Sequence, residues 1–258
     1  MSFTPLADAV AAPAPVRVVL IAITKHGAQQ TAELARLLPG ASVCVADKFA
    51  PLMAGLSNPV RAYSGPFRDE IGPLFADFDQ LVFFVSLGAV VRLIAPHMKT
   101  KDEDSGVVVV DDAGQFVIPV LSGHIGGANA MAEQIAALLG GTAVLTTASD
   151  VGKTIAVDIL GRELGWRVES PKFNITRVSA AVVNEEPVAV VQEAGSPHWW
   201  IRPTPLPASI HKFTRFEEVD LAHFKAVLWI THAEVTPAHW AQLHERLVVY
   251  RPPQGQGV

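Results

Sequence analysis

The segment with the clearest chemical potential is the glycine-rich run LSGHIGGAN, from Leu121 to Asn129. Its three glycines, Gly123, Gly126 and Gly127, let the chain turn tightly and let a ligand approach the backbone closely. The run joins an expected strand to an expected helix, so backbone N–H groups and the positive end of the helix should point at the loop. Such a junction can bind a carboxylate or a phosphate.

Polar side chains in this run add to its potential. His124 can exchange a proton near neutral pH, and Ser122 and Asn129 can hydrogen-bond a substrate. The structural alternative is a glycine-rich connector in which Asn129 caps the helix and His124 lies on the surface. The pattern favours the functional interpretation without excluding this alternative.

A basic cluster precedes this run in the segment VRLIAPHMKTK, which contains Arg92, His97, Lys99 and Lys101. Arginine can hold a carboxylate through two parallel hydrogen bonds, and lysine can add a point charge. We therefore expect Arg92, Lys99 and Lys101 to bind substrate carboxylates. The alternative is a solvated loop whose charge is balanced by three acidic residues, Asp102, Glu103 and Asp104.

Two other polar turns follow expected strands. Lys25 lies in TKHG after the first strand, and SLGAVVR follows the strand that contains Phe83 and Phe84. In a doubly wound sheet, ligands bind at the carboxyl ends of the strands. We therefore expect Lys25 to face the same crevice as the glycine-rich run and to contact the substrate.

The elements that must position these residues follow from runs of buried apolar character and from turn signals. Strands are expected at residues 16–23, 41–47, 60–65, 80–88, 142–148, 187–192 and 226–232, with an Asp-Ala-Gly hairpin at 106–120. Helices are expected at residues 29–38, 67–75, 89–96, 130–140, 154–166 and 174–184.

This alternation predicts an α/β fold, with a mostly parallel sheet covered by helices on both faces and a smaller second α/β unit. Residues 1–15 form a mobile leader, 16–148 an N-terminal domain and 149–258 a smaller central-type domain. The proline-rich segment 194–210 is expected to be a surface loop. The tryptophans of HWW and LWI, which are Trp199, Trp200 and Trp229, are expected to be core or interface residues.

Composition excludes several classes of protein. Half of the 258 residues are hydrophobic and 17% are charged, so most of the chain should fold. The net charge of −5 disfavours nucleic acid, and no apolar run is long enough to span a membrane. With no secretory signal, we expect a cytoplasmic protein.

Three possible motifs are not expected to be functional sites. The one cysteine, Cys44, is expected in the core, and the scattered histidines disfavour a metal site. The segment DVGKT lacks the first glycine of the P-loop pattern.

The run from Ser86 to Asp150 resembles the CbiG family of cobalt-precorrin-5A hydrolases of anaerobic cobalamin biosynthesis. The resemblance is carried by VVVVDDAGQFVIPVLSGHIGGAN and VLTTASD, and a weaker likeness extends through AVDILGRELGWRVESPKFN. It implies a substrate that is a flat cobalt macrocycle bearing many acetates and propionates. The enzyme opens a ring-A acetate lactone with water, releases acetaldehyde and gives cobalt-precorrin-5B. The cobalt belongs to the substrate, so no cofactor or protein metal site is expected.

The reaction that the resemblance implies lets us propose roles for the glycine-rich run, although the sequence does not identify the catalytic base. His124 is expected to act as general base on the water, while the N–H groups of Gly126 and Gly127 stabilise the oxyanion. Ser122 is an alternative nucleophile, although no His-Asp pair accompanies it in the sequence. If His124 is only a loop residue, Asp111 or a substrate carboxylate is expected to activate the water.

Complete family members usually carry a further C-terminal domain, which we do not expect in this chain. The domain is expected to be a separate polypeptide; the alternative is that the chain is a partial homologue with a reduced role. We expect the chain to be a hydrolase. The competing hypotheses are a corrinoid-binding module that needs a partner for chemistry, and an unrelated anion-binding α/β protein.

Overall fold

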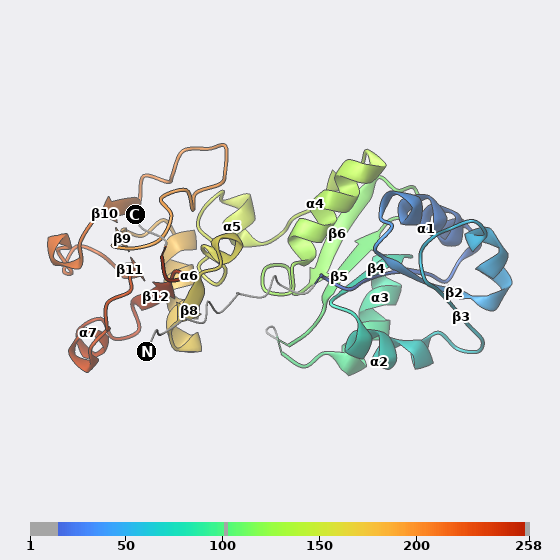
Figure 1. The fold of residues 1–258 in the computed structure, drawn as a ribbon, viewed down its shortest axis with the longest axis horizontal. Coiled ribbons are helices and arrows are strands. Elements are labelled where there is room, and N and C mark those ends of the chain that lie inside the picture. Colours follow the sequence, from blue (N-terminus) through green and yellow to red (C-terminus); the bar gives the residue numbers. More distant parts are fainter. Residues whose placement is uncertain (1–14, 101–102, 256–258) are drawn as a thin grey trace, which may run out of the picture. The chain divides into compact units, whose positions relative to one another are not determined.

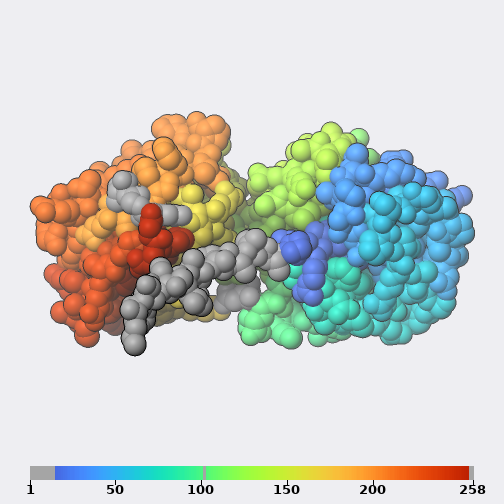
Figure 2. Space-filling model, viewed as in Figure 1, coloured from blue at the N-terminus to red at the C-terminus, as the bar shows by residue number. Residues whose placement is uncertain are grey.

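A computed structural model of the protein describes residues 15–100 and 103–255. It divides into two compact units, with unit 1 ending at Ala143 and unit 2 beginning at Val144 (Figure 1). In the space-filling view, the blue to green residues of unit 1 and the yellow to red residues of unit 2 each form a closely filled body (Figure 2). All of the expected leader except Pro15 lies outside the described residues, as does Lys101.

Unit 1 is built on a seven-stranded sheet of order β3-β2-β1-β4-β5-β6-β7. Its strands are β1 (Val18–Ala22), β2 (Ser42–Ala46), β3 (Val60–Tyr63), β4 (Gln80–Phe84), β5 (Gly106–Val110), β6 (Phe116–Leu121) and β7 (Thr142–Ala143). Its helices are α1 (Lys25–Leu37), α2 (Arg68–Asp77), α3 (Leu87–Ile94) and α4 (Ala128–Leu139), with short 3-10 helices η1 (Asp47–Met53) and η2 (Ala95–His97).

The helices cover both faces of this sheet, as the sequence predicts. Alternate strand residues point to opposite faces, so Leu20 packs beneath α1 and α4 while Ile21 packs beneath α2 and α3. Figure 1 shows α1 and α4 on one side of the sheet and α2 and α3 on the other. Cys44 is fully buried on the α2 and α3 side, which confirms its expected place in the core.

The chain reverses direction at the β5–β6 hairpin, and the Asp-Ala-Gly turn makes this reversal. Asp111 accepts hydrogen bonds from Phe116 N–H (2.6 Å) and Ala113 N–H (3.2 Å) through its two carboxylate oxygens. Gly114 adopts a left-handed φ of 67°, and its N–H donates to the Asp111 carbonyl (2.9 Å). The predicted hairpin is therefore confirmed, and β6 pairs antiparallel with β5.

This reversal separates the polar turns that the sequence analysis expected to converge. We call the edge where β1, β4 and β5 begin the amino edge, and the edge where they end the carboxyl edge. Leu121, at the end of β6, pairs with Val107 near the start of β5, so the Ser122–Asn129 loop lies at the amino edge. Lys25 follows β1 at the carboxyl edge. The expectation of one shared crevice was wrong, because β6 runs against the other strands.

Unit 2 contains a five-stranded sheet of order β10-β9-β11-β12-β8, parallel except for β8. Its strands are β8 (Arg167–Glu169), β9 (Val188–Gln192), β10 (Ile210–Phe213), β11 (Ala226–Ile230) and β12 (Leu247–Arg251). Its helices are α5 (Ala148–Val151), α6 (Lys172–Val183) and α7 (Pro237–Gln242), with 3-10 helices η3 (Arg162–Leu164) and η4 (Phe216–Glu218). Hydrophobic clusters lie on both faces of this sheet.

Two expected elements differ from the structure. Residues 154–166 form turns and the short η3 instead of the expected amphipathic helix. Val157 and Trp166 are both buried in the core of unit 2, and the chain between them follows an irregular course. The buried Tyr250 hydroxyl donates to the Val157 carbonyl (2.7 Å), and Gly161 turns left-handed where a side chain would overlap Trp166. The strand expected at 142–148 is reduced to β7.

The core position expected for the tryptophans is confirmed for Trp199 and Trp229, whereas Trp200 is half-buried. Trp166, Trp199 and Trp229 are almost fully buried, and Trp199 lies within the proline-rich loop that was expected at the surface. Its indole N–H donates to the Gln192 side chain (2.8 Å), which ties the loop to β9. Among the described residues, no helix is long and apolar enough to cross a membrane.

Gly27 gives a direct test of how tightly α1 packs on the sheet. A Cβ at Gly27 would lie 2.6 Å from the Phe84 carbonyl oxygen, whereas a Cβ at Gly40 would meet nothing within 4 Å. Alanine gains about 1 kcal/mol over glycine in a helix, but overpacking against backbone costs roughly 1–3 kcal/mol.

We therefore expect Gly27→Ala to lower the free energy of unfolding, measured by urea denaturation followed by circular dichroism. Gly40→Ala should change it by less than about 0.5 kcal/mol. A Gly27→Ala protein as stable as Gly40→Ala would contradict the close contact between α1 and β4.

Candidate functional site

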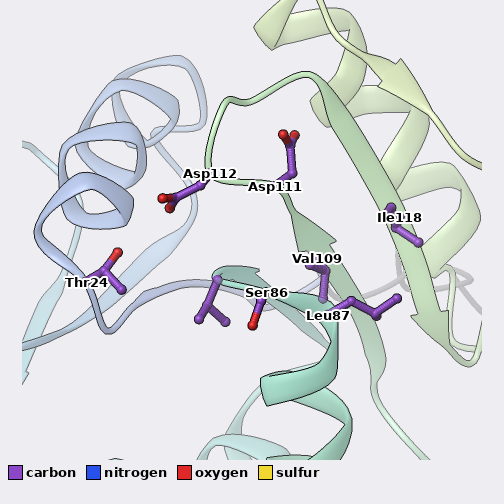
Figure 3. A pocket seen from close by; sticks show the side chains of 8 residues that line it. Thr24, Ser86, Leu87, Val109, Asp111, Asp112 and Ile118 are labelled. Atoms are coloured by element: carbon purple, nitrogen blue, oxygen red, sulfur yellow. The ribbon is translucent and has the colours of Figure 1, made fainter.

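A pocket lies at the carboxyl edge of unit 1, where the strand order changes direction. The chain passes from β1 to β2 and β3 on one side, and then returns to place β4 on the other side of β1. This switch point is the usual ligand site of an open α/β sheet. Its cavity of about 460 Å³ is lined by Thr24, Val85, Ser86, Leu87, Val109, Asp111, Asp112 and Ile118 (Figure 3).

Much of the polar lining of this pocket already stabilises turns. Thr24 caps α1 by accepting the Gly27 N–H (3.0 Å), and Asp111 holds the hairpin. Asp112 lies 3.6 Å from the His26 ring nitrogen, and its carbonyl accepts from the Gln30 amide. The pocket is therefore largely apolar, and the Asp111 carboxylate is held by the hairpin, whereas the Asp112 carboxylate is exposed.

Two of the expected substrate-binding residues are directed to this carboxyl edge. Lys25 is exposed in the first turn of α1. Arg92 lies in the last turn of α3, but its guanidinium reaches back and donates to the Gly88 carbonyl (2.9 Å) in the first turn. Neither side chain shares an edge with the Ser122–Asn129 loop.

The loop at the amino edge folds back onto the start of α4. Three backbone bonds close it: Gly127 N–H donates to His124 O (3.0 Å), Ala128 N–H to Ser122 O (3.2 Å) and Asn129 N–H to Gly123 O (3.0 Å). The first N–H groups of the helix are thus satisfied by loop carbonyls. The expectation that these groups face an open crevice was wrong for all three, and Gly127 N–H is engaged where it was expected to stabilise an oxyanion.

Close contacts or backbone conformation explain why each of the three loop positions is a glycine. A Cβ at Gly126 would lie 2.8 Å from the Ser122 carbonyl oxygen, and one at Gly123 would lie 2.5 Å from the Asn129 side-chain oxygen. Gly127 is left-handed, with a φ of 81°. The glycine spacing that was interpreted as room for a ligand is therefore required by the turn itself.

Ser122 is the strained residue of the loop. Its φ is 52°, a left-handed value that costs a non-glycine residue about 1 kcal/mol or more. The residue is 7% exposed, and its hydroxyl is buried with no hydrogen-bond partner among the described residues. Strain combined with an unsatisfied hydroxyl is typical of a functional loop. Because the hydroxyl is covered, Ser122 could act as a nucleophile only if the loop opened.

The part of the basic segment around Lys99 lies beside this loop, whereas Arg92 does not. Lys99 N–H donates to the Asp104 carboxylate (2.8 Å), and the Asp104 carbonyl oxygen lies 3.2 Å from the position of a Gly126 Cβ. Lys99 is exposed. The structure thus brings Lys99 and the half-buried His124 to the same edge, while Lys101 lies outside the described residues.

Gln80 is a residue at this edge that the sequence analysis missed. It begins β4 and is 3% exposed, and its side-chain amide donates to the Gly126 carbonyl. A glutamine at the start of an apolar strand carries no motif, so only the position of the loop reveals its role.

The described part of the chain contains no group of three or more His, Cys, Asp or Glu residues that could hold a metal ion. Burial raises the pKa of Cys44 to about 11, so its thiol is protonated at neutral pH and is not a nucleophile. His124 and Ser122 are the residues at the amino edge that the sequence analysis predicted to be catalytic.

Two family models match the chain. The one described as Cobalamin synthesis G N-terminal matches residues 70–150, and the one described as Cobalamin biosynthesis central region matches residues 155–252. The chain belongs to the CbiG family. The first match includes Gln80, Lys99 and the Ser122–Asn129 loop, whereas Lys25 lies outside it.

Two similar curated proteins are both named cobalt-precorrin-5A hydrolase. The chain is 44% identical over 233 residues to cobalt-precorrin-5A hydrolase of Priestia megaterium, covering 90% of this chain and 62% of that protein. It is 31% identical over 192 residues to cobalt-precorrin-5A hydrolase of Salmonella typhimurium, covering 72% and 49%. The chain thus spans between about half and two thirds of the length of these CbiG relatives.

A solved structure also resembles the chain. It is a cobalamin biosynthesis protein G homolog from Sulfolobus solfataricus, with 19% identity and a TM-score of 0.48 over 92% of this chain and 60% of that chain.

The two edges can be separated by matched lysine variants. If corrinoid carboxylates bind at the amino edge, Lys99→Ala should raise the dissociation constant about 2- to 5-fold, the effect of an exposed charged contact of ~0.5–1 kcal/mol. Lys25→Ala removes another exposed lysine, at the carboxyl edge, and should leave the constant unchanged. A spectral titration with cobalt-precorrin-5A measures both. Weaker binding by Lys25→Ala alone would place the ligand in the switch-point pocket.

Proposed function

We propose that this chain acts as a cobalt-precorrin-5A hydrolase, opening the ring-A acetate lactone with water and releasing acetaldehyde to give cobalt-precorrin-5B. The observation that carries the proposal is the 44% identity over 233 residues to a protein named for this activity. The cobalt arrives with the corrinoid, so the protein is proposed to hold no metal or cofactor of its own.

The amino edge of unit 1 is the proposed reaction site. His124 is proposed as general base on the attacking water, a role that contributes about 10²- to 10⁴-fold to a rate. Gly127 N–H already donates to His124 O, so of the two expected oxyanion donors Gly126 N–H is the one that we retain. Ser122 stays the alternative nucleophile, conditional on opening of the loop.

Binding of the macrocycle is proposed to use the neighbouring basic segment. Lys99 is exposed beside the loop, and Lys101 follows it two residues later. Gly123 and Asn129 support this surface by shaping the loop, because Asn129 N–H donates to the Gly123 carbonyl.

A second candidate function is a corrinoid-binding module that needs a separate C-terminal chain for turnover. The observation that favours it is the coverage of the relatives, of which 62% and 49% align with this chain. The site residues would then bind the corrinoid, and the partner would complete the reaction.

An acetaldehyde assay on the isolated chain separates these candidates. We expect incubation with cobalt-precorrin-5A to release acetaldehyde in proportion to the corrinoid consumed. Corrinoid binding without acetaldehyde would support the binding module. If the chain neither binds the corrinoid nor releases acetaldehyde, both proposals are contradicted.

The role of His124 is tested by replacing it and a matched histidine. His124→Ala should lower the rate of acetaldehyde release by at least ~10²-fold with little change in corrinoid affinity, because the base acts on the water. His26→Ala removes an exposed histidine at the carboxyl edge of the same unit and should keep the wild-type rate. Near-normal turnover by His124→Ala would mean that the water is activated elsewhere.

A further inference from the structure

The Gln80 side chain occupies a narrow slot at the amino edge of the sheet. Its amide nitrogen donates to the carbonyl of Gly126, 46 residues later in the chain. Its amide oxygen is buried against Gly106, where any Cβ would overlap it, and has no hydrogen-bond partner among the described residues. A Cβ at Gly127 would lie 3.1 Å from the amide nitrogen. Glycines on two segments therefore make room for this one amide.

The bonds within the Ser122–Asn129 loop fix its shape but not its place. The carbonyls of Ser122, Gly123 and His124 accept from the loop and the start of α4. The carbonyl of Gly126 accepts instead from the first residue of β4. This contact ties the loop to the central part of the sheet, next to the residue pair Gln80 and Gly106.

The same contact also bears on the strain at Ser122. A left-handed serine persists only where its surroundings hold it. A Cβ at Gly126 would lie 2.8 Å from the Ser122 carbonyl oxygen, so the two residues are closely packed. Holding the Gly126 carbonyl therefore also holds Ser122, and His124 lies between them in the chain.

We propose that Gln80 is a positioning residue for the reaction site: its amide holds the Ser122–Gly127 turn so that His124 and the Gly126 N–H meet the lactone. The inference rests on the proposed function for its catalytic consequence. Its structural part, that the amide fixes the loop, stands independently. Misplacement of reacting groups by about 1 Å can cost on the order of 10²-fold in rate.

Gln80→Met is the informative variant, because methionine fills a similar volume without an N–H donor. Asn58 supplies a matched control in the same unit. It is 6% exposed, its amide donates to the Leu38 (2.8 Å) and Ala41 (2.9 Å) carbonyls, and its own oxygen is buried without a partner among the described residues. Asn58→Leu thus removes an equally buried amide that holds a different turn.

The first measurement is amide hydrogen exchange, which reports local opening of a segment. Exchange at Gly127, Ala128 and Asn129 should rise at least about 10-fold in Gln80→Met and stay at the wild-type rate in Asn58→Leu. Wild-type exchange at these three amides in folded Gln80→Met would overturn the proposal, whatever the activity of the chain.

The second measurement separates a positioning role from general destabilisation. We expect kcat for acetaldehyde release to fall about 10- to 100-fold in Gln80→Met with KM nearly unchanged. Asn58→Leu should keep its kcat even if its melting temperature falls as far. Faster exchange in Gln80→Met with an unchanged kcat would refute the catalytic part. A wild-type chain that releases no acetaldehyde would instead refute the proposed function, and the exchange result would still decide the role of Gln80.

Discussion

The antiparallel pairing of β6 with β5 is the constraint on which the geometry of the site depends. Five parallel strands bring their polar turns to the carboxyl edge, and one hairpin sends the next loop to the opposite edge. The Asp111 carboxylate makes this reversal by accepting two backbone N–H groups. As a result the usual ligand position of the fold and the loop shared with the CbiG family lie at different edges of one sheet. Hydrogen bonds that close turns occupy Thr24 and Asp111 in the pocket, whereas the amino edge keeps an unsatisfied hydroxyl.

At the amino edge, steric demands and chemistry are closely coupled. The glycines are required by close contacts with neighbouring atoms, and the N–H groups of Gly127, Ala128 and Asn129 donate to carbonyls of the loop. These three N–H groups are therefore not directed at an anion, as the sequence analysis expected. The loop provides a rigid turn that carries His124 and stores strain at Ser122, and rigid placement of a reacting group is itself a large contribution to catalysis. Under the proposed function, side chains that hold this turn, such as Gln80, would contribute to the reaction without contacting the substrate.

Local patterns in the sequence were enough to predict most of unit 1. Buried apolar runs predicted its strands, and the Asp-Ala-Gly turn predicted the hairpin. The hairpin also implies that Lys25 and His124 lie at opposite edges. The sequence analysis missed this because it assumed that the strand before His124 is parallel to the others. Residues 154–166 have a helical pattern of apolar residues but do not form a helix. The distant Tyr250 hydroxyl binds the Val157 carbonyl, and Trp166 packs against Gly161 where a side chain would not fit. Gln80 was beyond prediction because its partner lies 46 residues away and no local motif marks it.

The most direct test of this account is the location of bound corrinoid, mapped by amide hydrogen exchange of the chain with and without cobalt-precorrin-5A. The account predicts protection at Lys99, Asp104 and the Ser122–Asn129 loop, with the turns after β1, β4 and β5 unchanged. Protection confined to Thr24–Gly27, Ser86–Gly88 and Asp111–Asp112 would contradict it, because the substrate would then occupy the switch-point pocket at the other edge of the sheet.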